Sequence, residues 1–399
     1  MITDQAVPAL GLLLGPEVAD LLEAVLTEAG GQYLSARTTQ VRYVPGKSVT
    51  AQYATQVRWP DGTTVTVTMV AASGIRVPEG TVQVETGEAK VALWRYPNDP
   101  FLPGLAPAAD PERVGRLLSK LGAPTGTVRL RRRAYRPGRR AVIEVVSPQA
   151  RVFLKVVRPD QVADLQEKHT SMAGQVPVPH SYGWSEEMGL VAIQAMPGKT
   201  LRKAIESGSS RLPTAAQLVA LLDGLPAASA STSLVAGPIE RATDHSRLLK
   251  SVLPDLTDRI DTLIDTFQGV DDEAAVSVHG DFHTSQVLTK GASVVGLIDV
   301  DTAGRGARAN DLASMLGHVS VLSTTSAARR RASRYGASLI SDFDLLTDPS
   351  DLRRRVAAMV FGYATGPFRV QQTKWATETE RRIALAEQWA NSAADKTRS

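Results

Sequence analysis

The chain has 399 residues, of which 43% are hydrophobic and 22% are charged. This composition is typical of folded globular proteins, and the length predicts two or three domains. The chain has no cysteine, which excludes disulfide bonds, thiolate zinc sites and a cysteine nucleophile. It also has no apolar run of about 18 residues or more, the length that a membrane helix needs, so we expect a cytoplasmic protein that binds no membrane.

The first 126 residues predict a small α+β domain. Apolar residues recur at helical spacing over residues 16–29, and Gly30 and Gly31 end that helix. Two segments rich in β-branched residues follow, at 41–53 and 63–72, and the Trp-Pro-Asp-Gly turn at 59–62 predicts a hairpin between them. After a helix at 111–121, the residues 122–126 read as a linker and mark the domain boundary.

A short motif occurs in both the first domain and the segment that follows it. Tyr43 begins a Tyr-x-Pro-Gly-basic sequence, and so does Tyr135. Each copy continues into a second β-type segment, which favours a duplicated β-rich unit over coincidence. The copies differ at Lys155, which stands among apolar residues in a predicted strand where the first copy has no lysine. A lysine in a buried strand needs an anionic partner, and either Asp164 or Glu167 could supply it.

Six arginines lie between Arg131 and Arg140. Such a stretch is compatible with a nucleic-acid surface, a phosphate-handling loop or a solvated strand edge. Only Tyr135 is interspersed among these arginines, so stacking on single-stranded bases has little support. The net charge of +4 does not decide between these alternatives, because basic and acidic residues nearly balance over the whole chain.

From Leu201 onward the sequence becomes rich in alanine and leucine and mainly helical. Helices are expected at 212–225 and 248–267, and two more within 356–389. This change of composition marks a second lobe.

The clearest chemical pattern starts at His279-Gly-Asp281 and continues through Gln286 to Asp299. A hairpin that turns at Lys290-Gly291 places Gln286 and Asp299 at the same end, with Asp281 in the loop just before. Carboxylate and amide oxygens of this kind suit Mg²⁺, which binds through one or two carboxylates and substrate phosphates. The sequence therefore predicts a magnesium site there.

These residues resemble the aminoglycoside phosphotransferases and their relatives among the choline, homoserine and maltose kinases. The family pattern is His-Gly-Asp-x-x-x-x-Asn, then Ile-Asp-x-Asp, then Asp-Leu-Ala; this chain has Gln286 in place of Asn, Asp299 and Asp301 in the second motif, and Asp311 in the third. The resemblance extends over residues 128–317. It implies an α+β, bilobal protein-kinase-like fold, with a β-rich nucleotide lobe at 127–197, a helical lobe with the catalytic loop at 198–399, and an extra N-terminal α+β domain at 1–126.

The resemblance also implies roles for individual residues. Asp281 would be the catalytic base or would orient the acceptor hydroxyl, and Asp299 would be the principal Mg²⁺ ligand, with Gln286 and Asp301 as further candidate ligands. The nucleotide, ATP or GTP, would be held by these residues: Lys155 on the phosphates, Glu167 on Lys155, Arg139 in the loop between the first two strands, and the backbone of Gln194 and Met196 at the adenine edge. Phosphoryl transfer needs positioning and charge neutralisation, which these groups supply.

Two further residues have structural expectations. His279 is expected to brace the catalytic loop, and Asp311 to cap a helix that begins at Leu312 and to anchor the loop. Glutamine in the motif resembles the maltokinase-like branch, which favours a sugar or amino sugar as acceptor. That branch and the glucosamine-kinase-like proteins also carry an extra N-terminal domain, and the Tyr-x-Pro-Gly repeat predicts that here it is a degenerate copy of the nucleotide lobe.

The main hypothesis is thus a small-molecule kinase that needs Mg²⁺ and binds a nucleotide and a small hydroxylated acceptor, as a monomer or homodimer. Two alternatives remain open at this stage. One is a nucleotide-binding pseudokinase in which Gln286 weakens the metal site, and the other is nucleic-acid binding through the arginine stretch, which the main hypothesis excludes.

Overall fold

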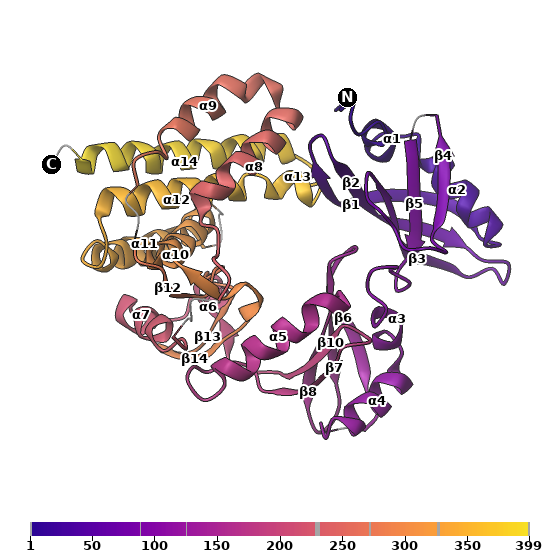
Figure 1. Cartoon of the computed structure of the whole chain (residues 1–399), viewed down its shortest axis with the longest axis horizontal. Coiled ribbons are helices and arrows are strands. Elements are labelled where there is room, and N and C mark those ends of the chain that lie inside the picture. Colours follow the sequence, from indigo (N-terminus) through magenta and orange to yellow (C-terminus); the bar gives the residue numbers. More distant parts are fainter. Residues whose placement is uncertain are drawn as a thin grey trace. The chain divides into compact units, whose positions relative to one another are not determined.

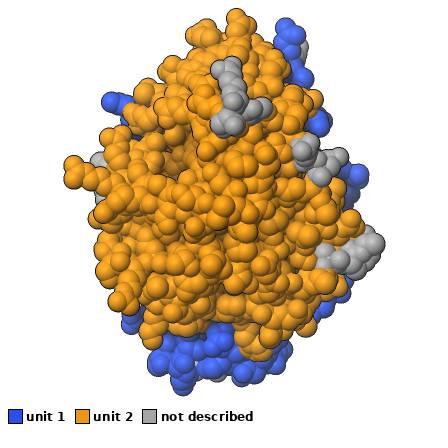
Figure 2. Space-filling model, turned by 90° about the vertical axis from the view of Figure 1, so that its left-hand side faces the viewer, with its two compact units in different colours: residues 1–163, 182–194, 367–375 blue, residues 164–181, 195–366, 376–399 orange. Residues whose placement is uncertain are grey.

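The computed structural model describes residues 2–87, 89–124, 126–227, 232–270, 273–324 and 328–397. The chain divides into two compact units (Figure 2): unit 1 comprises residues 1–163, 182–194 and 367–375, and unit 2 comprises residues 164–181, 195–366 and 376–399. Unit 1 is built around two five-stranded antiparallel sheets, whereas unit 2 is mainly helical (Figure 1). The mixed α+β class expected from the sequence is confirmed.

The first sheet of unit 1, the N-terminal sheet, has the strand order β1-β2-β3-β5-β4. It consists of β1 (Gln32–Val44), β2 (Ser48–Arg58), β3 (Thr64–Ser73), β4 (Val82–Thr86) and β5 (Ala89–Arg95), and is preceded by α1 (Ala9–Leu14) and α2 (Val18–Glu28). The hairpin at 59–62 is confirmed. The single strand expected over 41–53 is wrong, because Gly46 has a φ of 71° and turns the chain between β1 and β2.

The second sheet repeats this order as β6-β7-β8-β10-β9. Its strands are β6 (Arg129–Arg136), β7 (Arg140–Val146), β8 (Arg151–Val157), β9 (Ser181–Ser185) and β10 (Leu190–Gln194). Two helices again precede the sheet, α3 (Leu105–Ala108) and α4 (Pro111–Lys120), and Asp110 caps α4 by accepting the N–H groups of Glu112 and Arg113. The two sheets differ after their third strands. In the second sheet, β8 is followed by the helix α5 (Pro159–Met172), whereas in the N-terminal sheet residues 74–81, which connect β3 to β4, contain no helix.

Strand register shows which residue of the N-terminal sheet corresponds to Lys155. Lys155 on β8 pairs with Val142 on β7. When the two Tyr-x-Pro-Gly motifs are aligned, Val142 corresponds to Thr50, and Thr50 pairs with Ala72. Lys155 is therefore replaced by an alanine in the N-terminal sheet.

The face of the N-terminal sheet that contains Ala72 is filled by apolar packing. Val70, Ala72, Ala92 and Trp94 share this face, since Ala72 pairs with Ala92 and Val70 with Trp94. They belong to one continuous hydrophobic core that includes α3, α4 and the second sheet. The part of the face on β3 and β5 is therefore buried, whereas Thr50 and Gln52 on β2, which share the face, are partly exposed.

Unit 2 surrounds a helical core with two small sheets. Its helices are α6 (Leu201–Glu206), α7 (Ala215–Asp223), α8 (Pro238–Val252), α9 (Thr257–Asp265), α10 (Arg308–Leu322), α11 (Arg329–Phe343), α12 (Pro349–Tyr363) and α14 (Trp375–Thr397), and α13 (Gly366–Arg369) lies at the border with unit 1. The strands are β11 (Lys199–Thr200), β12 (Val276–Val278), β13 (Val287–Lys290), β14 (Ser293–Leu297) and β15 (Gly304–Gly306). Helix α10 packs against α11 and α12, and α12 packs against α8.

The continuous helix expected over 248–267 is wrong. Helix α8 ends at Val252, and a 3₁₀ turn at Pro254–Leu256 separates it from α9. The reason is Pro254, which lacks an N–H group for the helical ladder and disfavours helical geometry in the residue before it.

Candidate active site

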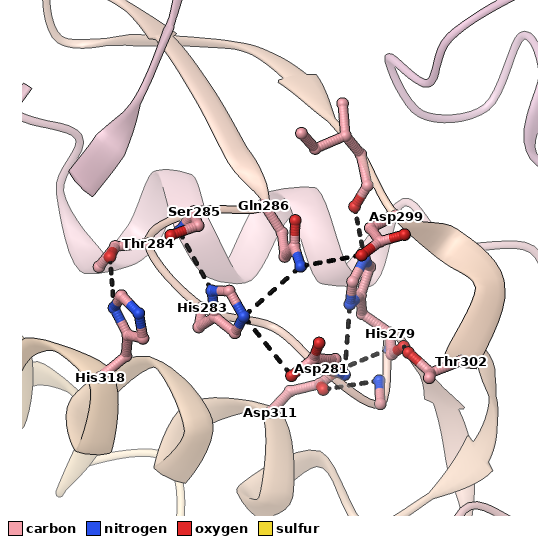
Figure 3. Close-up of polar contacts among 12 residues, drawn as sticks. His279, Asp281, His283, Thr284, Ser285, Gln286, Asp299, Thr302, Asp311 and His318 are labelled. Carbon is pink, nitrogen blue, oxygen red and sulfur yellow. Dashed lines mark hydrogen bonds and ion pairs between the residues drawn. The ribbon is translucent and has the colours of Figure 1, made fainter. Parts of the chain in front are cut away.

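The buried carboxylate of Asp311 holds the loop between β12 and β13. The backbone N–H groups of His279 and Gly280 donate to the two oxygens of Asp311, at 2.7 and 2.9 Å (Figure 3). Gly280 has a φ of 76°, and a Cβ there would lie 2.4 Å from the carbonyl oxygen of Thr302. Only glycine fits this position without moving the backbone.

Of the two roles expected of Asp311, the helix cap is wrong, because α10 begins at Arg308 and Asp311 lies within its first turn. The other role, as anchor of the loop, agrees with the hydrogen bonds to His279 and Gly280. Burial raises the pKa of Asp311, against the opposing effect of His279 and the two N–H donors. The aspartate thus anchors the loop.

His279 connects the loop to the strand that ends at Asp299. Its Nδ1 accepts the N–H of Asp281 at 3.3 Å, so its proton is on Nε2, which donates to the carbonyl of Ile298 at 3.0 Å. Thr302 Oγ1 in turn donates to the carbonyl oxygen of His279, at 3.0 Å. His279 has both ring nitrogens engaged, which is the arrangement of the bracing residue that the sequence predicted.

Asp281 is the loop carboxylate that solvent can reach. Its side chain is 43% exposed, and its Oδ1 lies 3.6 Å from Nε2 of His283. The N–H of Ser285 donates to Nδ1 of His283 at 3.1 Å, so the ring turns its Nε2–H towards Asp281. Burial would raise the pKa of Asp281, but the contact with His283 outweighs it and holds that pKa below its ordinary value. Asp281 is therefore ionised at neutral pH.

A further histidine, His318, stacks against His283. The rings of His283 and His318 stack with centroids 4.5 Å apart and planes 8° apart, and Nδ1 of His318 lies 2.6 Å from Oγ1 of Thr284. Burial, together with His283 and Arg202, lowers the pKa of His318 to about 3. His318 is consequently neutral and adds no charge beside Asp281. The sequence analysis missed it, because a lone histidine within a helix carries no pattern.

Gln286 and Asp299 meet as the predicted hairpin requires. Val287 on β13 pairs with Leu297 on β14, and Nε2 of Gln286 donates to Oδ2 of Asp299 at 3.3 Å. Asp299 has a φ of 61°, a left-handed conformation that is rare for residues other than glycine. The hairpin thus brings an amide and a carboxylate together beside Asp281.

The amide of Gln286 and the carboxylate of Asp299 suit a magnesium ion once the amide group is rotated. Nε2 of Gln286 lies 3.4 Å from Nε2 of His283, so two donors face each other. A half-turn of the amide would offer its oxygen to that histidine and to a cation beside Asp299. Among the described residues, no three His, Asp or Glu side chains form a metal-binding group, so phosphate and water oxygens would complete the coordination.

Asp301 lies in the 3₁₀ turn that follows, Val300–Thr302. Its backbone carbonyl accepts a hydrogen bond from Nζ of Lys168 at 2.9 Å, and Lys168 also pairs with Asp164 at 2.8 Å. Of the two acids proposed for Lys155, Asp164 thus has a partner on its own helix. The sequence did not indicate a role for Lys168, because a single lysine on the polar face of a helix is part of no recognisable motif.

The remaining predicted nucleotide residues are distributed over both units. Lys155 is 7% exposed on β8, Arg139 lies in the turn between β6 and β7, and Gln194 ends β10, all in unit 1. In unit 2, Met196 lies against Gly296 of β14. Glu167 is exposed and lines a cavity of about 400 Å³ together with these unit 2 residues: Asp164, Lys168, Ser171, Thr232, Ser233 and Ser277.

The first four residues of the arginine stretch, Arg131, Arg132, Arg133 and Arg136, lie on β6, an edge strand of the second sheet, while Arg139 lies in the following turn and Arg140 begins β7. Arg132 donates to Thr68 and lies 4.6 Å from the ring centroid of Tyr96, and Arg133 pairs with Glu144 at 2.5 Å. Burial and neighbouring arginines, Arg42 first, lower the pKa of Arg139 to about 10. These contacts favour the strand-edge interpretation for part of the stretch and leave Arg139 in a basic turn.

Comparisons with known proteins identify one family. The model of the phosphotransferase enzyme family matches residues 132–346, just over half of the chain. A protein of Ralstonia eutropha JMP134 assigned to the aminoglycoside phosphotransferases has 14% identity and a TM-score of 0.49, over 72% of this chain and 98% of that one.

Two further structures were compared. A thermostable mutant of aminoglycoside phosphotransferase APH(4)-Ia, in complex with ADP and hygromycin B, has 15% identity and a TM-score of 0.48, over 70% of this chain and 97% of that one. The streptomycin–ATP–APH(2″)-IIa complex has 14% identity and a TM-score of 0.45, over 64% and 89%. No curated protein sequence matches the chain significantly. Within the described residues, no helix is long and apolar enough to cross a membrane.

Proposed function

Because the chain belongs to the phosphotransferase enzyme family and is a small-molecule kinase, we propose that it transfers the γ-phosphate of ATP or GTP to a hydroxyl group of a sugar or amino sugar. The observation that carries the proposal is the polar network at the end of one hairpin. It places the ionised Asp281 beside Gln286 and Asp299, with His283 between them. This combination provides a proton acceptor next to a site for a phosphate-bound cation.

Asp281 would act on the acceptor. Its carboxylate accepts the hydroxyl proton while the hydroxyl oxygen bonds to the γ-phosphorus and the bond from that phosphorus to the bridging oxygen breaks, which releases ADP or GDP. The lowered pKa of Asp281 keeps it deprotonated before this step. Its exposure leaves one side of the carboxylate open to an acceptor.

Asp299 and Gln286 would hold Mg²⁺, with Asp301 as a further candidate ligand. The ion would neutralise negative charge on the phosphates when bound. The left-handed backbone at Asp299 supports a functional role, because strain of this kind is retained where surrounding structure imposes a needed geometry.

The nucleotide would lie on the second sheet. Lys155, supported by Glu167, would contact the phosphates under the turn that carries Arg139, and the backbone at Gln194 and Met196 would receive the adenine edge. We retain the division into an N-terminal domain (1–126), a nucleotide lobe (127–197) and a helical lobe (198–399) as part of this proposal.

A sugar-type acceptor is supported by the glutamine of the His-Gly-Asp-x-His-x-x-Gln motif, which resembles that of maltokinase-like proteins. A cationic acceptor has less support. The regularly spaced acids of the segment 255–265 are all exposed, and one of them, Asp261, pairs with Lys250, as expected of a solvated helix face.

The test is Mg²⁺-dependent release of ADP or GDP across a panel of hexoses, amino sugars, maltose, aminoglycosides and choline-like alcohols. Asp281→Ala should reduce acceptor-stimulated release about a thousandfold, because removal of a general base and its charge costs this much or more. Asp258→Ala, on the exposed face of α9, is the matched control and should keep full activity.

Transfer that depends on Asp281 for one acceptor class would establish both the reaction and the acceptor. Nucleotide binding without transfer to any member of the panel would contradict the proposal and support the pseudokinase alternative. In that case Gln286→Asn, which restores the common family residue, would show whether the metal site is the cause.

A further inference from the structure

The two sheets of unit 1 share one hydrogen-bonding device at the tip of their first hairpin. In the N-terminal sheet, the hydroxyl of Tyr43 and the N–H of Gly46 both donate to Oδ2 of Asp4, at 2.7 and 2.8 Å. In the second sheet, the hydroxyl of Tyr135 and the N–H of Gly138 both donate to Oδ2 of Asp99, each at 2.8 Å. We call each set an Asp-Tyr-Gly clamp.

The second clamp is more deeply buried than the first, since Asp99 is 4% exposed and Asp4 is only partly buried. In both clamps the other carboxylate oxygen accepts the N–H group two residues ahead: that of Phe101 at 2.9 Å and that of Ala6 at 3.0 Å. The indole N–H of Trp94, from the last strand of the N-terminal sheet, donates to the Tyr135 hydroxyl at 2.9 Å. The N-terminal sheet therefore takes part in holding the hairpin of the second sheet.

Gly138 is held through both of its backbone groups. Its N–H is bonded to Asp99, and its carbonyl accepts a hydrogen bond from Nε of Arg158 at 2.8 Å. Arg158 itself lies over the ring of Phe101, 4.9 Å from the centroid. A Cβ on Gly138 would lie 3.2 Å from that same ring, so the turn is enclosed on this side as well.

The clamped turn carries the residue expected over the phosphates. Arg139 directly follows Gly138, and its N–H donates to the carbonyl of Arg136 at 3.0 Å to close the turn. A turn fixed before the ligand arrives loses little conformational freedom on binding, whereas a mobile turn must be ordered at the expense of affinity.

We propose that Asp99 is a positioning residue for the nucleotide phosphates, and that the N-terminal sheet, through Trp94, supports it in this role. This rests on the proposed function, in which the turn between β6 and β7 covers the phosphates. The clamp of the N-terminal sheet is not given this role, because the position that matches Lys155 there is Ala72, which is buried in the hydrophobic core.

The duplication supplies matched variants for the test. Tyr135→Phe and Tyr43→Phe each remove one hydroxyl from equivalent clamps and keep the ring and the carboxylate. For each, we would measure thermal unfolding, the Kd for ADP by calorimetry without acceptor, and kcat and KM for MgATP. Asp99→Asn and Asp4→Asn form a second pair with the same measurements.

We expect all four variants to unfold at lower temperature than the wild type, because each loses a hydrogen bond to a carboxylate. Only Tyr135→Phe and Asp99→Asn should weaken nucleotide binding, by about fivefold to tenfold in Kd and KM, with kcat at saturating nucleotide changed less than about twofold. Tyr43→Phe and Asp4→Asn should bind ADP like the wild type.

Equal effects of both pairs on Kd, or no effect of either, would overturn the positioning role and leave the clamps as structural devices. The proposed function fails differently, since the wild type itself would then bind no ADP or transfer no phosphate. If Asp99→Asn does not fold, the milder Tyr135→Phe decides alone.

Discussion

The two sheets of unit 1 have the same strand order and the same clamp, but they present different side chains on equivalent faces. The second sheet has Lys155 in its third strand and α5 after it. The N-terminal sheet has Ala72 at the matching position and no helix in the connection that follows. One backbone arrangement thus occurs with two different surfaces.

The difference shows that one strand arrangement can carry different surfaces. Strand pairing is determined by backbone hydrogen bonds and by the alternation of apolar side chains, and both sheets have these. A ligand site depends on a few polar groups and an open face. At the position that matches Lys155, the N-terminal sheet has an alanine that is part of the hydrophobic core.

The largest effect is expected when a lysine is placed in the N-terminal sheet at the position that matches Lys155. Ala72 is 1% exposed, so Ala72→Lys would place a long charged side chain in the core without a partner. We expect the free energy of unfolding to fall by about 3–5 kcal/mol, measured by chemical denaturation. Ala72→Met has similar length without the charge and should cost clearly less. Equal stability of Ala72→Lys and the wild type would show that this face is open.

The reciprocal change in the second sheet should affect activity. Lys155→Met should lower kcat/KM for the nucleotide about a hundredfold, because a positioned charge on the phosphates is lost. Lys90→Met, an exposed lysine of the N-terminal sheet paired with Glu85, is the control and should be fully active. Full activity of Lys155→Met would contradict the assigned role.

A smaller effect, which depends on pH, is expected at Glu144, whose counterpart in the N-terminal sheet is Gln52. The Glu144 side chain is 1% exposed and pairs with Arg133 and Arg151. Burial would raise its pKa, but the arginines outweigh burial and hold the pKa below its ordinary value. A carboxylate with a lowered pKa in the folded state stabilises the fold above the unfolded pKa of 4.5 and loses this contribution as the pH falls.

Glu144→Gln should therefore cost about 2 kcal/mol at pH 7, and its difference from the wild type should shrink as the pH is lowered below about 4.5. Denaturant unfolding at several pH values measures this directly. Gln52→Ala is the comparison in the other sheet, and its cost should not vary with pH in this range. A Glu144→Gln cost that stays constant down to pH 3 would exclude the ion pairs as its source.

Much of the candidate active site could be predicted from the local sequence. Gln286 and Asp299 flank a hairpin whose turn is marked by Lys290-Gly291, and the alternation of a strand determines which end its side chains share. His279 and Asp281 belong to a short motif in which spacing alone restricts the geometry. The repeat that begins at Tyr43 and Tyr135 was visible because the two copies match in residue type at four of five positions.

Most contacts between segments far apart in the chain could not be predicted from the sequence. Asp311 was expected to anchor the loop, but the sequence also read it as a helix cap and could not show which backbone groups its carboxylate binds. Asp4 and Asp99 precede their tyrosine partners, Tyr43 and Tyr135, by 39 and 36 residues along the chain. No local sequence pattern connects residues so far apart. His318 was equally invisible, because stacking on His283 depends on how α10 packs against the loop.

The sequence by itself determined the class of the protein, the order of its strands within each hairpin and the residues of the catalytic loop, because these depend on periodicity, turn chemistry and short motifs. Only the tertiary structure decided which backbone groups the carboxylate of Asp311 binds, which backbone groups hold the clamped turn, and which part of the N-terminal sheet is buried in the core. Those properties arise from burial and from hydrogen bonds between segments far apart in the chain, and neither is encoded in local spacing.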